Sequence, residues 1–266
     1  MKKFFYILVV FTVLSSCSEY QKVLKSEDIA TKFKMGETLY NEGKFGKANR
    51  LFAQIVPNYR GKPQAEKLMF LYSNSFYEMK DYYVAGYQFE RFASSYPNSE
   101  KAEEASFLSA KSYSMLSPVY TKDQKETTEA IDKLQTFINA FPESEYVSDA
   151  NKLVQELDFK LENKAFSIAK QYNTISDYEA SIKSFDNFIF DFPGSSLREN
   201  ALFFRLDSAY KLAMNSVERK KAVRLKKAIE YYDNFKESYS NSEYTAQADD
   251  MAGELNDAFK KYSTKS

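Results

Sequence analysis

The chain has 266 residues, with lysine plus arginine and aspartate plus glutamate both at 37, so its formal net charge at pH 7 is zero. That balance argues against nucleic acid as a partner, because nucleic-acid-binding surfaces need an excess of cations. Histidine is absent and there is a single cysteine, which excludes the usual Ser-His-Asp, Cys-His and structural zinc sites. We therefore expect no catalytic residues, no metal site and no cofactor; a hydrolase built on paired carboxylates is the alternative enzyme class, since Asp and Glu are plentiful.

The N-terminus has the pattern of a secretory signal. Two lysines precede an apolar run over residues 4–14, which is shorter than the roughly 20 residues of a membrane-spanning helix. The run ends in Leu14-Ser-Ser-Cys17, which resembles a bacterial lipobox, where the cysteine receives lipid. We expect a lipoprotein signal peptide at 1–16 and a lipidated, polar tether at 17–25; an ordinary signal peptide with an incidental cysteine is the alternative.

The only cysteine of the chain lies at the lipidation position, so no disulfide can form within the chain. Because each buried CH₂ of an acyl chain contributes about 0.8 kcal/mol, lipidation of Cys17 would anchor the protein without a spanning helix. The residues after it, Ser18 and Glu19, lack the aspartate associated with retention at the inner membrane. The outer membrane is therefore the expected location.

One pattern recurs along the rest of the chain. A small residue is followed by large apolar residues four and seven positions later, and by a proline slot twelve positions later. Such steps of four and three place side chains on one face of a helix, and the proline ends that helix. Regular copies begin at Ala85, Ala130, Ser181 and Ala228, the last with Ser240 in place of proline, and a looser copy begins at Ala48.

This spacing resembles the tetratricopeptide (TPR) repeat, in which a small residue lets two helices of a hairpin approach closely. The matching positions of the first helices hold Gly36, Ser73, Ala110, Ala169 and Ala209. The five copies begin 37 to 51 residues apart, more than the roughly 34 of a regular repeat. The extra residues fall near 116–127, 171–177 and 215–225. The hairpins are therefore expected to be irregular.

We predict an all-α fold, a right-handed α-solenoid of about five TPR-like hairpins with a C-terminal capping helix. N-terminal hairpins occupy 26–142, and C-terminal hairpins with the capping helix occupy 143–266. The capping helix over 243–261 buries Met251, Leu255, Ala258 and Phe259, and its charged face ends the stack.

Aromatic residues are abundant, with 23 Phe and 21 Tyr. Most are expected to fill hairpin cores, but the tyrosine hydroxyl favours grooves and interfaces. In a TPR-like stack the first helices line a concave groove, which suits an extended peptide with an aromatic end and a free carboxylate. The predicted groove residues are Phe33, Glu37 and Tyr40 of the first hairpin and Lys67, Phe70, Asn74 and Tyr77 of the second; covering of neighbouring hairpins is the alternative role for each.

The lipidated cysteine, short tether, five hairpins, terminal helix and repeated aromatic-Pro-x-Ser junction together resemble the BamD family of TPR lipoproteins over nearly the full length. The resemblance implies a lipid-anchored, periplasm-facing scaffold that binds BamA, the central barrel protein, through a POTRA domain. It also implies help in recruiting unfolded outer-membrane protein precursors by their C-terminal aromatic signal. Substrate is linked with the N-terminal hairpins and BamA with the C-terminal ones. Arg198 lies close to the family's partner-binding arginine, and the lysine-rich insertion from Arg219 to Lys227 departs from a tight hairpin.

Two other functions fit the same elements. A different periplasmic TPR lipoprotein could act as an adaptor in cell-envelope coordination or nutrient uptake. Starch-uptake lipoproteins of the SusD type also carry TPR helices, but they need a large glycan-binding lobe for which this chain has no room. A glycan-binding assay separates that class from an assembly scaffold.

Overall fold

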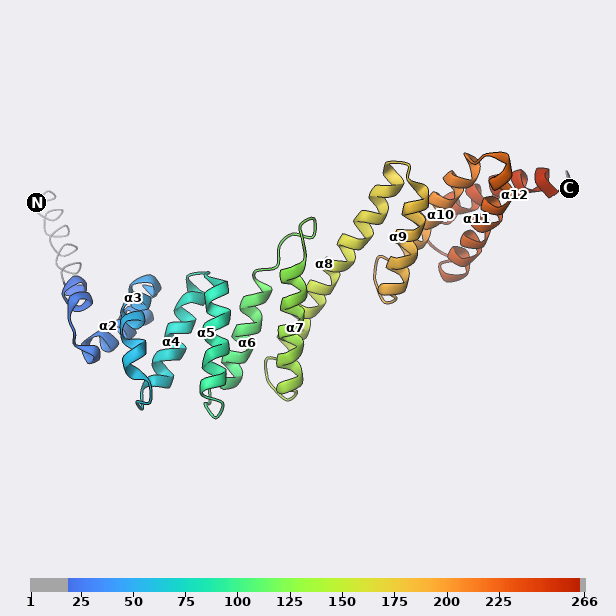
Figure 1. Ribbon diagram of the computed structural model, residues 1–266. Helices are drawn as coiled ribbons and strands as arrows, with labels where there is room; N and C mark the ends of the chain where they lie inside the picture. Colours follow the sequence, from blue (N-terminus) through green and yellow to red (C-terminus); the bar gives the residue numbers. More distant parts are fainter. Residues whose placement is uncertain (1–18, 264–266) are drawn as a thin grey trace, which may run out of the picture. The chain divides into compact units, whose positions relative to one another are not determined.

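The computed structural model describes residues 19–263, and every regular element in that range is a helix (Figure 1). The short first helix covers residues 19–25. The others are α2 (Ile29–Asn41), α3 (Phe45–Ile55), the 3-10 helix η1 (Val56–Tyr59), α4 (Ala65–Glu78), α5 (Tyr82–Ser95), α6 (Ala102–Ser114), α7 (Lys125–Ala140), α8 (Val147–Thr174), α9 (Tyr178–Asp191), α10 (Arg198–Met214), α11 (Glu218–Ser238) and α12 (Thr245–Ser263).

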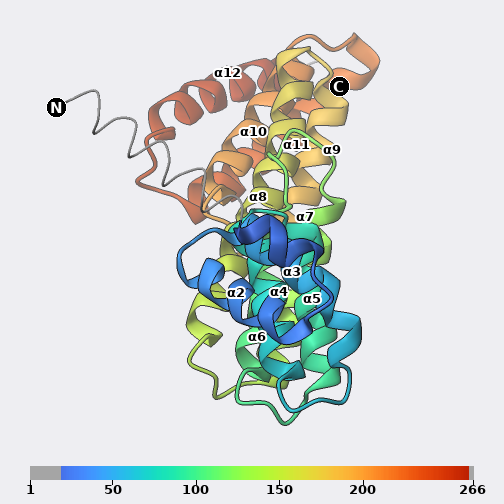
Figure 2. The same cartoon turned by 90° about the vertical axis from the view of Figure 1, so that its left-hand side faces the viewer.

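The helices pair in chain order as α2–α3, α4–α5, α6–α7 and α10–α11, and α12 closes the series. The second half of α8 pairs with α9 through Phe166, Ala169, Phe185 and Phe188. Neighbours in the sequence lie side by side, as α4, α5 and α6 do in Figures 1 and 2. The predicted all-α arrangement of five TPR-like hairpins with a terminal helix is therefore confirmed.

Contacts group the described residues into two compact units. Unit 1 comprises residues 19–118 and 123–157, and unit 2 comprises 119–122 and 158–263. Helix α8 contributes to both: Ala150 and Leu157 belong to a cluster of unit 1, whereas Phe166 and Ala169 belong to a cluster of unit 2. The boundary between the two units falls between Leu157 and Asp158, inside α8. The predicted division into N-terminal and C-terminal hairpins after residue 142 is a different one and stays a prediction.

The small residues of the repeat lie where two helices of a hairpin touch. Those of the second helices (Ala48, Ala85, Ala130, Ser181 and Ala228) are all completely buried. Most rings four or seven positions later are completely buried too, among them Phe52, Phe89 and Phe235, whereas Tyr232 is partly buried. Burying one such ring contributes about 1.5–3 kcal/mol. The period-four spacing thus aligns a close helix contact with a large apolar side chain.

The junctions repeat one backbone geometry. The residues that end α5, α7, α9 and α11 (Tyr96, Phe141, Phe192 and Tyr239) have φ between −125° and −141° and ψ near 61–64°. Each ring packs on the phenylalanine four residues earlier, with centroids 5.3–6.3 Å apart. Tyr239 has this geometry although Ser240 replaces proline after it, so the aromatic pair accompanies the helix end with or without proline.

A serine–glutamate hydrogen bond closes three of the hairpins. The serine of the aromatic-Pro-x-Ser junction donates its hydroxyl to a carboxylate on the first helix of the same hairpin, and it accepts a hydrogen bond from the backbone N–H two residues later. The pairs are Ser99 with Glu66, Ser144 with Glu103 and Ser195 with Glu162. A hydrogen bond to a charged group contributes about 1.5–3 kcal/mol.

Two segments differ from expectation. The sequence predicts a polar tether up to residue 25, but residues 19–25 are helical, and Tyr20 and Val23 are buried against Leu51. Tyr20 and Val23 are three positions apart, so they share one face of the helical turn and can be buried together. The polar composition of this segment does not indicate that face. The extra residues near 215–225 mostly extend α11, which begins at Glu218.

Helix α12 packs on α10 and α11 and completes the largest core of unit 2 (Figure 2). Met251 and Leu255 are buried as predicted, with Ala258 and Phe259 partly buried beside them. Asp249 on the outer face accepts hydrogen bonds from Lys236 and Tyr232 of α11, each at 2.8 Å. A capping helix with one apolar and one charged face is thus confirmed.

Candidate functional site

Four of the predicted groove residues form a polar row across α2 and α4, the first helices of the first two hairpins. The carboxylate of Glu37 pairs with the ammonium of Lys67, and the amide of Asn74 donates a hydrogen bond to the Tyr40 hydroxyl. The Lys67 side chain is 58% exposed and that of Glu37 is 32% exposed. The row therefore offers an acid, a cation, an amide and a phenol at the surface.

Tyr40 is fixed on two sides. Its ring meets Phe45 edge-on, with centroids 5.3 Å apart and planes at 76°. Burial is the main cause that raises the pKa of Tyr40, while the hydrogen bond from Asn74 opposes the rise. The phenol is therefore neutral near pH 7 and can both donate and accept a hydrogen bond.

Phe33 and Phe70 lie elsewhere than predicted. Phe33 is 7% exposed and stacks on Tyr59 with ring centroids 5.6 Å apart. Phe70 packs edge-on against Phe89 and Phe92, at 5.8 and 5.5 Å. Phe33 is thus a core residue and Phe70 mainly fills a hairpin core, because the second helix of the same hairpin, and for Phe33 also η1, covers this side of the helix. Helical periodicity alone does not say which side is covered.

Tyr77 is half-buried at the end of α4. Its ring meets that of Tyr82 at the start of α5, with centroids 5.5 Å apart and planes at 70°. This contact pins the α4–α5 turn, where Lys80 adopts a positive φ of 63°. Tyr77 therefore lies one turn beyond Asn74, at the end of the polar row.

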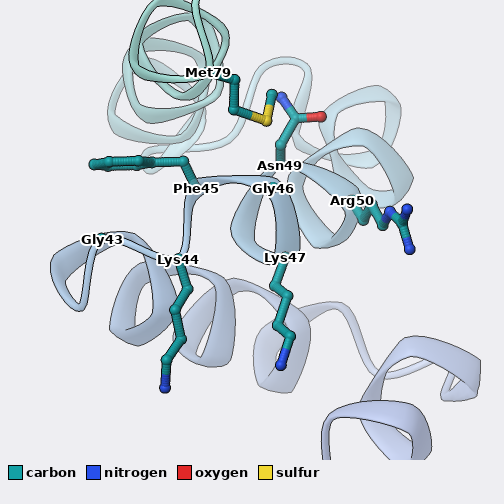
Figure 3. Close-up of a pocket in the computed structure, with 8 residues that line it drawn as sticks. All are labelled: Gly43, Lys44, Phe45, Gly46, Lys47, Asn49, Arg50 and Met79. Carbon is teal, nitrogen blue, oxygen red and sulfur yellow. The ribbon is translucent and has the colours of Figure 1, made fainter.

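A depression of about 720 Å³ lies beside Tyr40, at the α2–α3 turn (Figure 3). Figure 3 shows the Lys44 and Lys47 side chains pointing the same way, away from Phe45 and Met79. Gly43 makes the turn with a φ of +73°, which residues with a side chain rarely adopt. The sequence analysis did not single out Lys44 and Lys47 at the rim of this depression. The run Gly43-Lys44-Phe45-Gly46-Lys47, with two glycines and two lysines in a helix–helix turn, is the sequence feature that indicates them.

A second depression, of about 590 Å³, lies at the α3–α4 turn and the end of α5. Arg60 and Arg91 line it together with apolar and aromatic side chains that include Met69 and Tyr96. Two guanidinium groups over an apolar floor suit a ligand with both a carboxylate and an aromatic group. The residues are scattered in the sequence, so no motif indicates them.

Arg198 begins α10 in unit 2 and is half-buried. Its Nη1 donates to the backbone carbonyl of Ile189 at 2.9 Å, which ties α10 to the end of α9. Arg205, which sequence reasoning missed, is buried, pairs with Asp186 at 2.8 Å and stacks over the Tyr231 ring at 4.2 Å. Both arginines thus hold neighbouring helices together.

Among residues 19–263, no group of three or more His, Cys, Asp or Glu side chains is placed to hold a metal ion. In the same range, no helix is both long and apolar enough to cross a bilayer. The predicted signal peptide and Cys17 lie outside the described residues.

The curated relatives are assembly factors of the outer membrane. "Outer membrane protein assembly factor BamD" of Rickettsia prowazekii (strain Madrid E) is 24% identical over 221 residues, which cover 80% of this chain and 86% of the relative. The protein of the same description from Pasteurella multocida (strain Pm70) is 21% identical, over 84% of this chain and 89% of the relative. "Putative outer membrane protein assembly factor BamD" of Aquifex aeolicus (strain VF5) is 25% identical, over 66% and 59%.

Among solved structures, the TPR2AB domain of yeast Sti1, in its complex with pHSP90, aligns with a TM-score of 0.39 and 14% identity. The alignment covers 86% of this chain and 98% of that one. A family model described as "YfiO: Outer membrane lipoprotein" matches residues 26–225, which span the first four hairpins, α10 and the start of α11. Because this match covers most of the chain, the protein belongs to the YfiO family of outer membrane lipoproteins.

Proposed function

We propose that the chain is a scaffold lipoprotein of the outer-membrane β-barrel assembly machinery. It docks the central, BamA-like barrel protein through a POTRA domain and helps to recruit unfolded outer-membrane protein precursors. The observation that carries the proposal is the family match, together with relatives described as assembly factors over most of their length. Stacked hairpins support it, since such arrays expose long surfaces to protein partners.

For the precursor, we propose the polar row of α2 and α4 as the contact surface. A partly exposed ion pair such as Glu37–Lys67 contributes only about 0–1 kcal/mol. A peptide carboxylate can therefore replace Glu37 on Lys67 at small cost, while Tyr40 and Asn74 bind the peptide backbone. An aromatic side chain several residues before that carboxylate fits the depression beside Tyr40, whose apolar lining includes Phe45 and Met79.

For the POTRA domain, we propose unit 2, with Arg198 at the contact. One N–H of its guanidinium binds Ile189, and no carboxylate pairs with this group among the described residues. The remaining donors can meet a carboxylate on the partner in the bidentate geometry that arginine favours. The Ile189 bond would then hold the side chain in position for that contact.

Depletion of the protein tests the proposal. Outer-membrane β-barrel proteins are expected to fall on depletion, and the tagged full-length chain is expected to co-purify with a POTRA-containing barrel protein. Normal barrel levels after depletion would contradict the proposal.

Photo-crosslinking tests the two surfaces. A crosslinker at Tyr40, Lys67 or Tyr77 is expected to capture precursors, and one at Arg198 the barrel protein. A crosslinker at the exposed Glu126 of α7 is the control and should capture neither. Capture of precursors at Glu126 as efficiently as at Lys67 would refute the assignment of the polar row.

We also propose that Cys17 carries the lipid that holds the protein at the outer membrane, facing the periplasm. Replacement of Cys17 by Ala should stop acylation and release the protein from the outer-membrane fraction. Cys17→Ser serves as a second variant of similar size. Continued attachment of both variants would overturn the anchor without bearing on the hairpin surfaces.

A further inference from the structure

The first half of α11 carries a surface that the proposed function does not use. Residues 218–227 contain six basic residues and one acidic residue. Leu225 is the only one of these ten that is buried. The segment therefore extends α11 by more than two turns while adding little to the core of unit 2.

Three of the six cations bind their own protein. Lys221 donates to the backbone carbonyl of Met214 at 3.0 Å, Arg224 binds Ser216 and Glu179, and Lys227 pairs with Glu230 at 3.0 Å. The acid of the segment, Glu218, accepts a hydrogen bond from Tyr262. These contacts hold the extension of α11 on its neighbours.

The side chains of the other three cations, Arg219, Lys220 and Lys226, are exposed and make no ion pair or hydrogen bond within residues 19–263. At 100° per residue they fall on one side of α11 together with Val223, opposite Leu225. Val223 is 74% exposed, and Val217, just before the helix, is 63% exposed. These five residues (Val217, Arg219, Lys220, Val223 and Lys226) are called the α11 basic surface.

The arrangement is unfavourable for the isolated helix. Cations near a helix N-terminus oppose the helix dipole, and like charges on one face repel each other. Exposed valines also lower helix propensity and leave apolar area in water. A local arrangement that disfavours folding points to a ligand that is negatively charged and accommodates aliphatic side chains.

We propose that the α11 basic surface binds the anionic headgroups of a phospholipid membrane. Lysine is depleted at interfaces between proteins, whereas lysine-rich helices with exposed aliphatic side chains are typical of lipid surfaces. Membership in a family of outer membrane lipoproteins places a bilayer within reach. The cations contact lipid phosphates, while Val217 and Val223 enter the layer between headgroups and acyl chains.

Vesicle binding by residues 18–266 tests this proposal. That chain lacks the signal peptide and Cys17 but contains every hydrophobic cluster of the fold. It should bind vesicles that contain phosphatidylglycerol, bind pure phosphatidylcholine vesicles much less, and dissociate as the salt concentration rises. Absence of phosphatidylglycerol-dependent binding at low salt overturns the proposal.

Charge reversal locates the surface. Each exposed cation near an anionic membrane contributes a factor of about five to binding, so loss of three cations alone weakens binding about 100-fold. The triple variant Arg219→Glu, Lys220→Glu and Lys226→Glu also adds three repelled carboxylates and should therefore bind at least about 100-fold more weakly. The matched control Lys125→Glu, Lys152→Glu and Lys183→Glu makes the same change in net charge at exposed residues of other helices. Equal loss in both variants overturns the proposal, as does unchanged binding of the first. Circular dichroism verifies that both remain helical.

An acidic protein partner is the competing occupant. A soluble poly-glutamate peptide that binds the chain through Arg219, Lys220 and Lys226 more tightly than the vesicles do would decide for it and against lipid. Val217→Ser with Val223→Ser should weaken vesicle binding while leaving poly-glutamate binding unchanged. Undiminished vesicle binding by that double variant contradicts insertion of the valines.

Discussion

Replacement of Gly36 by alanine tests whether the first hairpin depends on a glycine at its closest contact. A Cβ at this position would lie 2.6 Å from Cε1 and 3.0 Å from Cδ1 of Phe52. Carbon atoms in contact are normally about 3.5–4.0 Å apart. Phe52 is completely buried, so its ring cannot move aside into solvent.

Two opposing effects set the size of the change. Overpacking of a core costs about 1–3 kcal/mol, whereas Gly→Ala inside a helix contributes about 1 kcal/mol of added stability. Gly36→Ala should therefore destabilise the protein by about 0–2 kcal/mol. Gly253 in α12 provides the matched control, because nothing lies within 4 Å of a Cβ built there. Gly253→Ala should stabilise by about 1 kcal/mol, so the difference between the variants isolates the overpacking cost.

Urea and thermal unfolding followed by circular dichroism measure both variants. Gly36 belongs to unit 1 and Gly253 to unit 2, so if the units unfold separately each variant shifts its own transition. In a Phe52→Leu background the shorter side chain should relieve the clash, and Gly36→Ala should then become neutral or stabilising. Equal stabilisation by Gly36→Ala and Gly253→Ala in the native background would refute the close contact.

The remaining predictions concern the junctions and the capping helix. Ser240→Pro should stabilise unit 2 by about 0.4–1 kcal/mol, because Tyr239 before it already has the backbone geometry seen before proline at the other junctions. Pro193→Ser should destabilise the protein by a similar amount. A shift of the urea midpoint in the same direction for both variants would contradict this. Ser195→Ala should destabilise by about 1–3 kcal/mol, because it leaves the Glu162 carboxylate without its hydroxyl donor, and an unchanged urea midpoint would show that this bond is dispensable. Hydrogen bonds from two side chains of α11 lower the pKa of Asp249, and the bond from Lys236 has a larger effect than the bond from Tyr232. The stability from this shift is present above the ordinary pKa of 3.8 and is lost as the pH falls through the lowered value. Asp249→Asn should therefore be less stable than the native chain at pH 7 but not at the lowest pH. A difference in unfolding free energy between the two chains that does not depend on pH would contradict this.

Part of the candidate site follows from the sequence. Glu37, Tyr40, Lys67 and Asn74 were placed on one surface by counting from the small contact residues, and the structure brings them together in pairs across α2 and α4. Phe33 satisfied the same count but is buried by its own hairpin and η1. Helical periodicity gives the direction of a side chain, but not what the neighbouring element covers.

The two depressions and Arg205 show the opposite case. Arg60 and Arg91 are 31 positions apart and belong to no repeat position, so only packing brings them to one cavity. Arg205 lies at the same helical face as the core residues Leu202 and Ala209, where the sequence predicts an apolar side chain. Its charge is accommodated because Asp186 and the Tyr231 ring come from two other helices.

The sequence by itself determined the all-α fold, the number of hairpins and the junction that ends the second helix of each hairpin, because these depend on contacts between residues close together in the sequence. Small residues at close contacts, aromatic rings four and seven positions later and the junction that follows are local signals, and each was recognisable without a structure. Tertiary structure decided which helix faces remain exposed, how α8 is shared between two cores and that residues 215–225 lengthen α11. Those outcomes depend on packing between segments that are distant in the sequence, and the repeat pattern does not encode them.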